Sequence, residues 1–345
     1  MMTSKEIFLK ALRFEDTPRL PVGVLDGYAW MLNQTGKSFE DFFNDPASVQ
    51  LVVEQYGKLG TDIVYSNGHV FNMVHKVMGG EIHCDKVGDA VEIRKSPLSE
   101  IGDYKNYNVD EVMEKAFATP EYVSVLGQAK ELYRLVGDEK LVSTLAYAPF
   151  TVAAMLVGVQ EFMATLVEDE DETIALIDFA TDLVIKSAEK FLDCGAEAVF
   201  MADPVASGDL ISPALYEMLV MASIQKVCKH FNARNVPVLC HICGHTEKRL
   251  EPLLESGLAA FSMDSVDLKT ALGIARGHYA ILGNFSPFDV LMSKNADEVR
   301  AICDAHAKVA GHGGGYILFP GCDLAPKTPL ENVQAMVAAA HNAFA

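Results

Sequence analysis

The sequence has little positive charge, no long apolar run and no signal-like N-terminus. Lys and Arg number 28 against 47 Asp and Glu, which gives a formal net charge of −19. No basic stripe is present that could neutralise the phosphates of a nucleic acid. The first 12 residues are amphipathic, and no segment approaches the roughly 20 consecutive apolar residues of a membrane span. We therefore expect a cytoplasmic protein with neither nucleic-acid nor membrane partners.

Cysteines are few and unevenly spaced. An odd number scattered through a chain of 345 residues is not typical of a secreted disulfide framework, so the thiols are expected to be reduced. Any one of them, taken alone, is most often a small buried hydrophobe. The seven positions are 84, 194, 228, 240, 243, 303 and 322.

Half of the residues are hydrophobic and 22% are charged, a composition typical of a compact globular protein. Short runs rich in Val and Ile recur, and a helical pattern follows each one, as in the amphipathic segment 214–231 after Ser212 and Pro213. Eight such runs predict an α/β fold of the (β/α)8 (TIM) barrel type. The predicted strands are 20–24, 62–65, 141–145, 198–202, 236–241, 260–263, 280–283 and 316–319.

Between the second and third predicted strands the chain is longer than one crossover needs. We expect residues 66–140 to contain an insertion packed on the barrel, with a hairpin-like stretch at 79–93. No repeat, low-complexity tract or linker divides the chain. The sequence therefore predicts a single domain over residues 1–345.

Polar residues follow the predicted strands, where barrel enzymes carry their active sites. Among them, His241 and Cys243 are two positions apart at a strand end, so their side chains point to the same side. Zinc in a catalytic site takes three protein ligands. Cys322, directly after the last strand, would stand on the same rim and could supply the third. One nitrogen and two sulfurs suit zinc better than magnesium or calcium, although the pair could also be ordinary strand packing.

Other candidate motifs have simpler interpretations. His69, His75 and His83 fall in the expected insertion and are interpreted as surface or core residues. The glycine-rich stretch 311–315 follows a helix and precedes a strand, which places it on the rim opposite the candidate site. No nucleophile elbow and no dinucleotide-binding fingerprint is present.

The strand-end motifs also resemble a known family. Ala202–Ser207, His241–Gly244, Gly283–Asn284 and Gly321–Asn332, in this order and spacing, are similar to the methylcobamide:coenzyme M methyltransferases of the uroporphyrinogen decarboxylase superfamily. The resemblance covers nearly the whole chain and is strongest from about residue 195 onward.

This resemblance implies a barrel in which His241, Cys243 and Cys322 hold zinc. It further implies methyl transfer from a separate methylated corrinoid protein to a thiol acceptor that is activated as its thiolate. The chain has no corrinoid-binding motif of its own, so the corrinoid must come on a partner protein. The nearest match is Asp304–Gly311, but its glycine lies farther from the histidine than in the Asp-x-His-x-x-Gly motif, and the segment is predicted to be helical.

Several points stay open at the sequence level. Where relatives can close the zinc shell with a glutamate, this chain has Asp264, a candidate ligand or neighbour of the ligands; Asp203 and Asn284 are candidate catalytic or orienting residues. The acceptor could be coenzyme M, tetrahydrofolate or another thiol. A methyltransferase that uses an O-methyl or N-methyl donor, or a zinc-stabilised binding protein, would be alternatives. A decarboxylase is disfavoured, because Val22–Trp30 lacks the arginines that hold porphyrinogen carboxylates.

Overall fold

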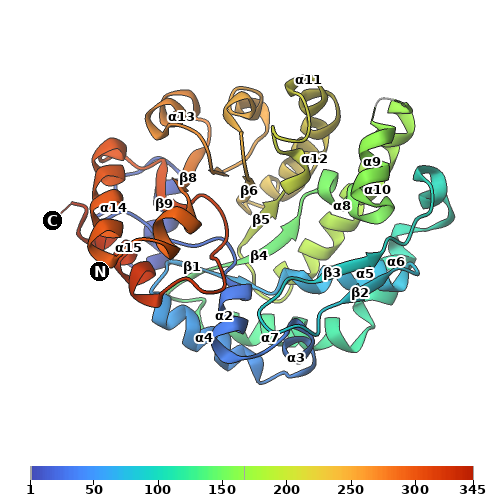
Figure 1. Cartoon of the computed structure of the whole chain (residues 1–345), viewed down its shortest axis with the longest axis horizontal. Helices are drawn as coiled ribbons and strands as arrows, with labels where there is room; N and C mark the ends of the chain where they lie inside the picture. The colour runs from blue at the N-terminus through green and yellow to red at the C-terminus, as the bar shows by residue number, and fades with distance from the viewer. Residues whose placement is uncertain (1, 167, 345) are drawn as a thin grey trace.

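A curled parallel sheet forms the centre of the computed structural model, which describes residues 2–166 and 168–344 (Figure 1). Seven strands of the described residues pair in the order β1-β4-β5-β6-β7-β8-β9, each parallel to its neighbour. Their side chains are almost all buried on both faces, as expected for a parallel sheet covered by helices. The strands are β1 (Ile63–Ser66), β4 (Leu141–Tyr147), β5 (Ala198–Ala202), β6 (Val238–Ile242), β7 (Ala260–Met263), β8 (Ala280–Phe285) and β9 (Tyr316–Pro320).

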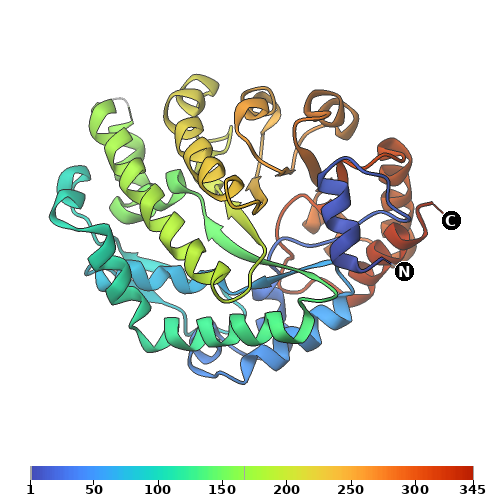
Figure 2. The ribbon, with the colours of Figure 1, turned by 180° about the vertical axis from the view of Figure 1, so that it is seen from behind.

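Helices cover the outer face of this sheet (Figure 2). Local sequence defines their starts: Thr119 caps a helix that has Pro120 in its first turn, and Asn295 with Glu298 forms a capping box. The helices are α1 (Ser4–Leu12), α2 (Tyr28–Thr35), α3 (Phe39–Asn44), α4 (Ser48–Leu59), α5 (Met73–Val77), α6 (Val109–Phe117), α7 (Pro120–Val136), α8 (Pro149–Val157), α9 (Val159–Thr165), α10 (Glu170–Leu192), α11 (Pro213–Leu215), α12 (Met221–Asn232), α13 (Leu268–Ala275), α14 (Ala296–Ala310) and α15 (Leu330–Asn342).

Shorter helical segments lie mostly in the loops that follow strands. The amphipathic pattern predicted for 214–231 is divided into α11, a π-helical segment and α12, with Ser212 as the predicted cap. The 3₁₀ segments are η1 (Gly68–Asn72), η2 (Ile101–Asn106), η3 (Pro204–Ala206), η5 (Glu247–Arg249) and η6 (Pro252–Glu255), and the π-helical ones are η4 (Tyr216–Val220) and η7 (Pro287–Met292).

The α/β class and the curled parallel sheet are confirmed, but the expected first strand at 20–24 does not form a strand. It makes a single parallel bridge from Val22 to Leu318 of β9. Its other edge faces β1, where the Asp62 N–H donates to the Val22 carbonyl at 2.8 Å. Pro21 lacks an N–H, and the Val22 N–H donates to the Asp62 carboxylate (2.9 Å) instead of a strand carbonyl. A side chain therefore replaces part of the expected ladder.

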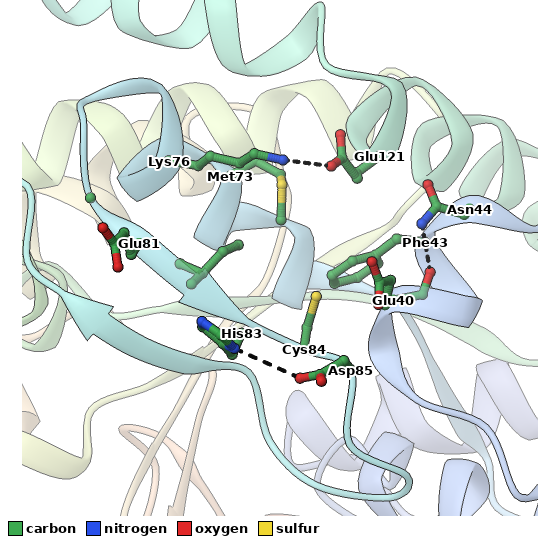
Figure 3. Close-up of a pocket in the computed structure, with 12 residues that line it drawn as sticks. Glu40, Phe43, Asn44, Met73, Lys76, Glu81, His83, Cys84, Asp85 and Glu121 are labelled. Atoms are coloured by element: carbon green, nitrogen blue, oxygen red, sulfur yellow. Dashed lines mark hydrogen bonds and ion pairs between the residues drawn. The ribbon is translucent and has the colours of Figure 1, made fainter.

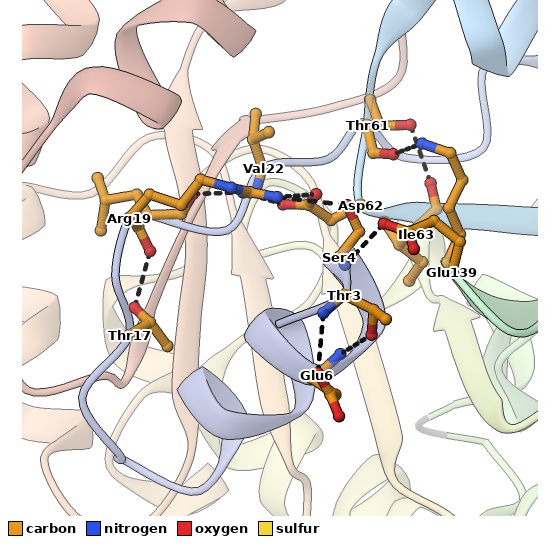
Figure 4. A network of polar contacts seen from close by, with 12 residues as sticks. Thr3, Ser4, Glu6, Thr17, Arg19, Val22, Thr61, Asp62, Ile63 and Glu139 are labelled. Carbon is orange, nitrogen blue, oxygen red and sulfur yellow. Dashed lines mark hydrogen bonds and ion pairs between the residues drawn. The ribbon is translucent and has the colours of Figure 1, made fainter. Parts of the chain in front are cut away.

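An ion pair strengthens this junction (Figure 4). Arg19 donates from both terminal nitrogens to the two carboxylate oxygens of Asp62, each at 2.7 Å, and the Asp62 side chain is fully buried. Gly23 lies so close to the neighbouring chain that a Cβ would be 2.3 Å from the Phe319 ring. The segment 20–24 thus lies between the two edges of the sheet, joined to both by a few specific contacts.

The hairpin predicted near 79–93 is present as the antiparallel strands β2 (Glu81–His83) and β3 (Glu92–Lys95). It lies beside α5 at one side of the molecule (Figure 1). That residues 66–140 are an insertion into a barrel stays a prediction. Within the described residues, no helix is both long and apolar enough to cross a membrane.

Candidate metal centre

His241 and Cys243 lie at the carboxyl end of β6, in the middle of the sheet. All five residues of β6 are buried, and His241 is 3% exposed. The His241 carbonyl accepts a hydrogen bond from the Asp203 N–H (2.8 Å), which aligns the end of β6 with the loop after β5. The predicted pair is therefore held on rigid, buried backbone.

The His241 ring has one engaged and one free nitrogen. Nδ1 lies 3.0 Å from Oγ of Ser262, which is the residue opposite His241 in the β6–β7 register. Nε2 is buried and has no hydrogen-bond partner among the described residues. A buried imidazole nitrogen normally has a partner. This arrangement is typical of a metal-ligating histidine, whose second nitrogen is oriented by a neighbouring polar group.

Cys322, directly after β9, meets Cys243 across the sheet mouth. The neighbouring Cys322 thiol and His241 imidazole hold the pKa of the Cys243 thiol well below its usual value. The same contact with Cys243, together with burial, raises the pKa of Cys322. One thiolate is thus stabilised by a neighbouring thiol and an imidazole. The three residues predicted as zinc ligands converge, although 79 residues separate Cys243 from Cys322 in the sequence.

The residue types fit zinc: an imidazole nitrogen that has no hydrogen-bond partner among the described residues, and two neighbouring cysteine sulfurs. Across residues 2–166 and 168–344, however, no group of three or more His, Cys, Asp or Glu side chains has an arrangement that could hold a metal ion. The side chains meet without having the geometry of a ligand shell. Their role as zinc ligands therefore stays a prediction.

Asp203 is fully buried at the end of β5. Its Oδ1 accepts hydrogen bonds from the Thr151 N–H (3.1 Å) and hydroxyl (2.6 Å), and its Oδ2 has no partner among the described residues. Burial raises its pKa to about 6, and the nearby Cys243 contributes in the same direction. Asp203 therefore connects the start of α8 with the cysteine site, and a catalytic role for it stays a prediction.

Asn284 and Asp264 form hydrogen bonds with the backbone of loops near the cysteines. Asn284, which lies within β8 and not after it, donates its side-chain amide to the carbonyls of Asp264 (3.2 Å) and Val266. The Asp264 carboxylate accepts from the Gly244 N–H (3.3 Å), and a Cβ on Gly321 would lie 2.9 Å from it. Asp264 thus bonds to the loop that carries Cys243 and lies close to Gly321, the residue before Cys322. Its role as a ligand is untested.

Sequence reasoning missed other polar residues near this rim. Ser262 could have been found from the register of the neighbouring strands, because it is level with His241. Ser207 donates to the Cys243 carbonyl at 2.9 Å. His69, interpreted above as a surface or core residue, lies just after β1 at the same end of the sheet. It pairs with the Asp26 carboxylate at 2.8 Å.

A cavity of about 510 Å³ adjoins the Cys243 loop. Its wall contains His245 and Asp209, whose side chains pair at 2.5 Å, and the buried Arg249. The Arg249 guanidinium donates to the Ile211 carbonyl (2.6 Å), has no carboxylate partner within the described residues, and leaves Nε without any partner. The cavity thus presents a buried cation near the candidate centre.

Another cavity, of about 520 Å³, lies between α3, α5, β2 and the start of α7 (Figure 3). Four of its twelve lining residues are acidic, and Lys76 pairs with Glu121 there at 3.0 Å. Cys84 in its wall has a pKa raised to about 11, chiefly because it is half buried. None of the predicted site residues lines this cavity.

Comparisons with known proteins agree with the strand-end motifs. The family described as Uroporphyrinogen decarboxylase (URO-D) matches residues 3–343. The chain is 27% identical to a methylcobamide:CoM methyltransferase MtaA of Methanosarcina barkeri over 99% of both chains, and 32% identical to an MtbA of Methanosarcina mazei over 71% of this chain and 68% of that one. A solved methyltransferase structure from Methanosarcina mazei superposes with a TM-score of 0.87 at 25% identity over all of both chains.

Proposed function

Because the chain belongs to the uroporphyrinogen decarboxylase (URO-D) family, in the branch of the methylcobamide:CoM methyltransferases, we propose that it transfers a methyl group from a methylated corrinoid protein to a thiol acceptor. The reacting site would be formed by His241, Cys243 and Cys322. We further propose that residues 20–24 complete an eight-stranded barrel around it, because they bridge the two edges of the sheet.

One observation carries this proposal: His241, Cys243 and Cys322 lie close together at the carboxyl end of the sheet, and the buried His241 Nε2 has no hydrogen-bond partner in the part of the chain that the structure describes. These three side chains would hold zinc, which when bound would supply a Lewis acid that favours the thiolate form of an acceptor. Ser262 contacts Nδ1 of His241 at 3.0 Å and would orient the ring, which leaves Nε2 as the nitrogen that could bind the metal. The acceptor thiolate would then attack the methyl carbon and leave the reduced corrinoid.

The cavity beside the Cys243 loop provides a place for an anionic end of the acceptor. The Arg249 guanidinium, which lies over the Tyr216 ring at 4.6 Å, and Lys248 would both contribute positive charge to this cavity. Glu247 also lines it, whereas the carboxylate of Asp209 pairs with His245. An acceptor with a sulfonate, such as coenzyme M, fits this chemistry.

The corrinoid would come on a partner protein. His306, in the only stretch of the sequence near to a cobalamin-binding motif, lies within α14, where its ring contacts the Tyr316 hydroxyl at 3.3 Å. It is therefore engaged in helix packing against β9. The open carboxyl end of the sheet is the face on which a corrinoid domain would dock.

The local charge disfavours a decarboxylase. Residues 22–30 contain no arginine, and the acidic residues Asp26, Asp203 and Asp323 lie at this end of the sheet. A substrate with many carboxylates would therefore meet acidic side chains there and no cation from residues 22–30. A methyltransferase that demethylates an O-methyl or N-methyl donor remains the alternative that the experiment must separate.

Zinc X-ray absorption on the purified protein, with and without 2-mercaptoethanesulfonate, tests the proposal. We expect one nitrogen and two sulfurs in the zinc shell, and a third sulfur after thiol addition. Cys243→Ala and Cys322→Ala should lose most of the zinc and the methyl transfer to thiol, while the matched control Cys240→Ala, on the opposite face of β6, should keep both. A zinc coordination shell that does not change when the thiol is added would favour the donor-demethylating alternative. Stoichiometric zinc in Cys243→Ala would refute the ligand assignment.

A further inference from the structure

The backbone around Cys243 is held by side chains of the neighbouring loops. Strand β6 ends at Ile242, so Cys243 is the first residue beyond it. The backbone of residues 243–245 bonds instead to side chains from the loops after β5 and β7. These bonds run from the Ser207 hydroxyl to the Cys243 carbonyl (2.9 Å), from the Gly244 N–H to the Asp264 carboxylate (3.3 Å) and from the His245 N–H to the Asp209 carboxylate (3.2 Å). The position of the Cys243 backbone therefore depends in part on side chains.

Ser207 is the buried member of this set on the β5 side, with an exposure of 5%. Its hydroxyl has one hydrogen, and the nearest acceptor is the Cys243 carbonyl; the Asp209 carboxylate lies farther away, at 3.2 Å. The same oxygen accepts a hydrogen bond from the Asp209 N–H at 3.2 Å. Ser207 thus connects its own loop to the carbonyl of a proposed metal ligand, with donor and acceptor both engaged.

The two loops approach each other so closely that glycines are needed at the contact. A Cβ on Gly208 would lie 2.0 Å from the His245 carbonyl oxygen, and one on Gly244 would lie 2.7 Å from the Ser207 hydroxyl. Asp209 also pairs with His245 at 2.5 Å, but both side chains are more than half exposed, so this ion pair contributes little by itself. The buried Ser207 hydroxyl is therefore the main fixed link between this loop and Cys243.

From these contacts we infer that Ser207, assisted by Asp209, is a positioning residue that holds the Cys243 sulfur in place for metal binding. The inference rests on the proposed function, because it concerns a proposed zinc ligand. His241 lies within β6 and is held by the strand ladder, whereas Cys243 lies beyond the ladder. Loss of the Ser207 hydroxyl should therefore act on Cys243 and leave His241 in place. Loss of a group that orients a metal ligand typically weakens metal binding about 10–100-fold.

Zinc affinity, measured by competition with a chromophoric chelator, tests the inference. We expect zinc binding to be roughly 10-fold weaker or more in Ser207→Ala. The matched control is Ser223→Ala in α12: Ser223 is also 5% exposed, and its hydroxyl donates to the Val220 carbonyl at 2.8 Å. Each alanine variant loses one buried hydrogen bond, so both should lose similar stability in urea unfolding. Only Ser207→Ala should also lose zinc affinity, which a purely structural role would not change.

The outcomes separate the inference from the function on which it rests. If Ser207→Ala is as destabilised as Ser223→Ala but binds zinc like the wild type, the inference is refuted and the methyl-transfer proposal stands. Should Ser207→Ala not fold, Asp209→Ala takes its place, because Asp209 is exposed and accepts from the His245 N–H; unchanged zinc affinity in that variant would refute the inference equally. A wild-type protein that binds no zinc would overturn the ligand assignment and the inference together.

Discussion

The junction of Arg19 and Asp62 should contribute more to stability than any exposed ion pair of this protein. Asp62 is fully buried and accepts three hydrogen bonds, two from Arg19 at 2.7 Å and one from the Val22 N–H at 2.9 Å. Asp62→Asn keeps the size of the side chain but removes its charge and one acceptor oxygen. Arg19, only 16% exposed at its side chain, then stays behind as a buried cation with an incomplete set of acceptors.

The magnitude follows from the cost of an unpaired buried charge. Removal of one partner of a buried ion pair typically costs about 3–5 kcal/mol. Arg19 retains some exposure and Asn retains one acceptor, so we expect about 3 kcal/mol for Asp62→Asn. For a fold of this size, a loss of about 3 kcal/mol is a large part of a total stability of roughly 5–15 kcal/mol.

Urea unfolding followed by circular dichroism measures this loss, provided that both proteins unfold in a single transition. Glu131→Gln is the matched control, because it removes an exposed pair with Arg134, which is 67% exposed, and should cost under about 1 kcal/mol. A change for Asp62→Asn as small as that of Glu131→Gln would refute the view that a side chain replaces the missing ladder between residues 20–24 and β1.

Three further predictions concern single side chains. Burial lowers the pKa of His75 to about 4, so as the pH falls this histidine is protonated in the unfolded chain before it is protonated in the folded one, and the free energy of unfolding falls between about pH 6.5 and 4. Between pH 7 and 5 the wild type should therefore lose about 2 kcal/mol more stability than His75→Leu, as measured by urea unfolding. Equal losses in the two proteins would contradict this. Ser262→Ala should weaken zinc binding roughly 10–100-fold in chelator competition, since the His241 ring loses its orienting partner; unchanged affinity would count against that role. Gly244→Ala, at φ 74° with its Cβ 2.0 Å from an Asp209 oxygen, should lower stability by about 1–2 kcal/mol in thermal unfolding, and no shift would argue against strain there.

The sequence could place the candidate site but not its supporting contacts. His241 and Cys243 were found because strand alternation sets their side chains on one side, and Cys322 because the carboxyl ends of parallel strands share one rim. Both arguments depend only on backbone geometry. That Asn284 holds the loop at Asp264 depends on side-chain reach across neighbouring loops, which linear order does not encode.

The errors have similar physical causes. The segment 20–24 has the composition of a strand, yet its pairing with β1 depends on the Asp62 carboxylate, a contact with a residue 40 positions away. His69 was not counted among the candidate site residues, because it falls in the long stretch after β1 that is predicted to be an insertion. Its position directly after a strand end is the same signal that identified His241, and applying it to every strand would have included His69 among the candidates.

Two kinds of residue therefore determine this sheet mouth. His241, Cys243 and Cys322 are defined by where strands end, and substitution there removes chemistry. Asp264 acts instead on the spacing of the two cysteine loops. Its carboxylate accepts a hydrogen bond from the Gly244 N–H, and it lies so close to Gly321 that a Cβ would not fit there. Residues of this second kind hold together loops that are far apart in the sequence, and in this way Cys243 and Cys322 become neighbours in the folded chain.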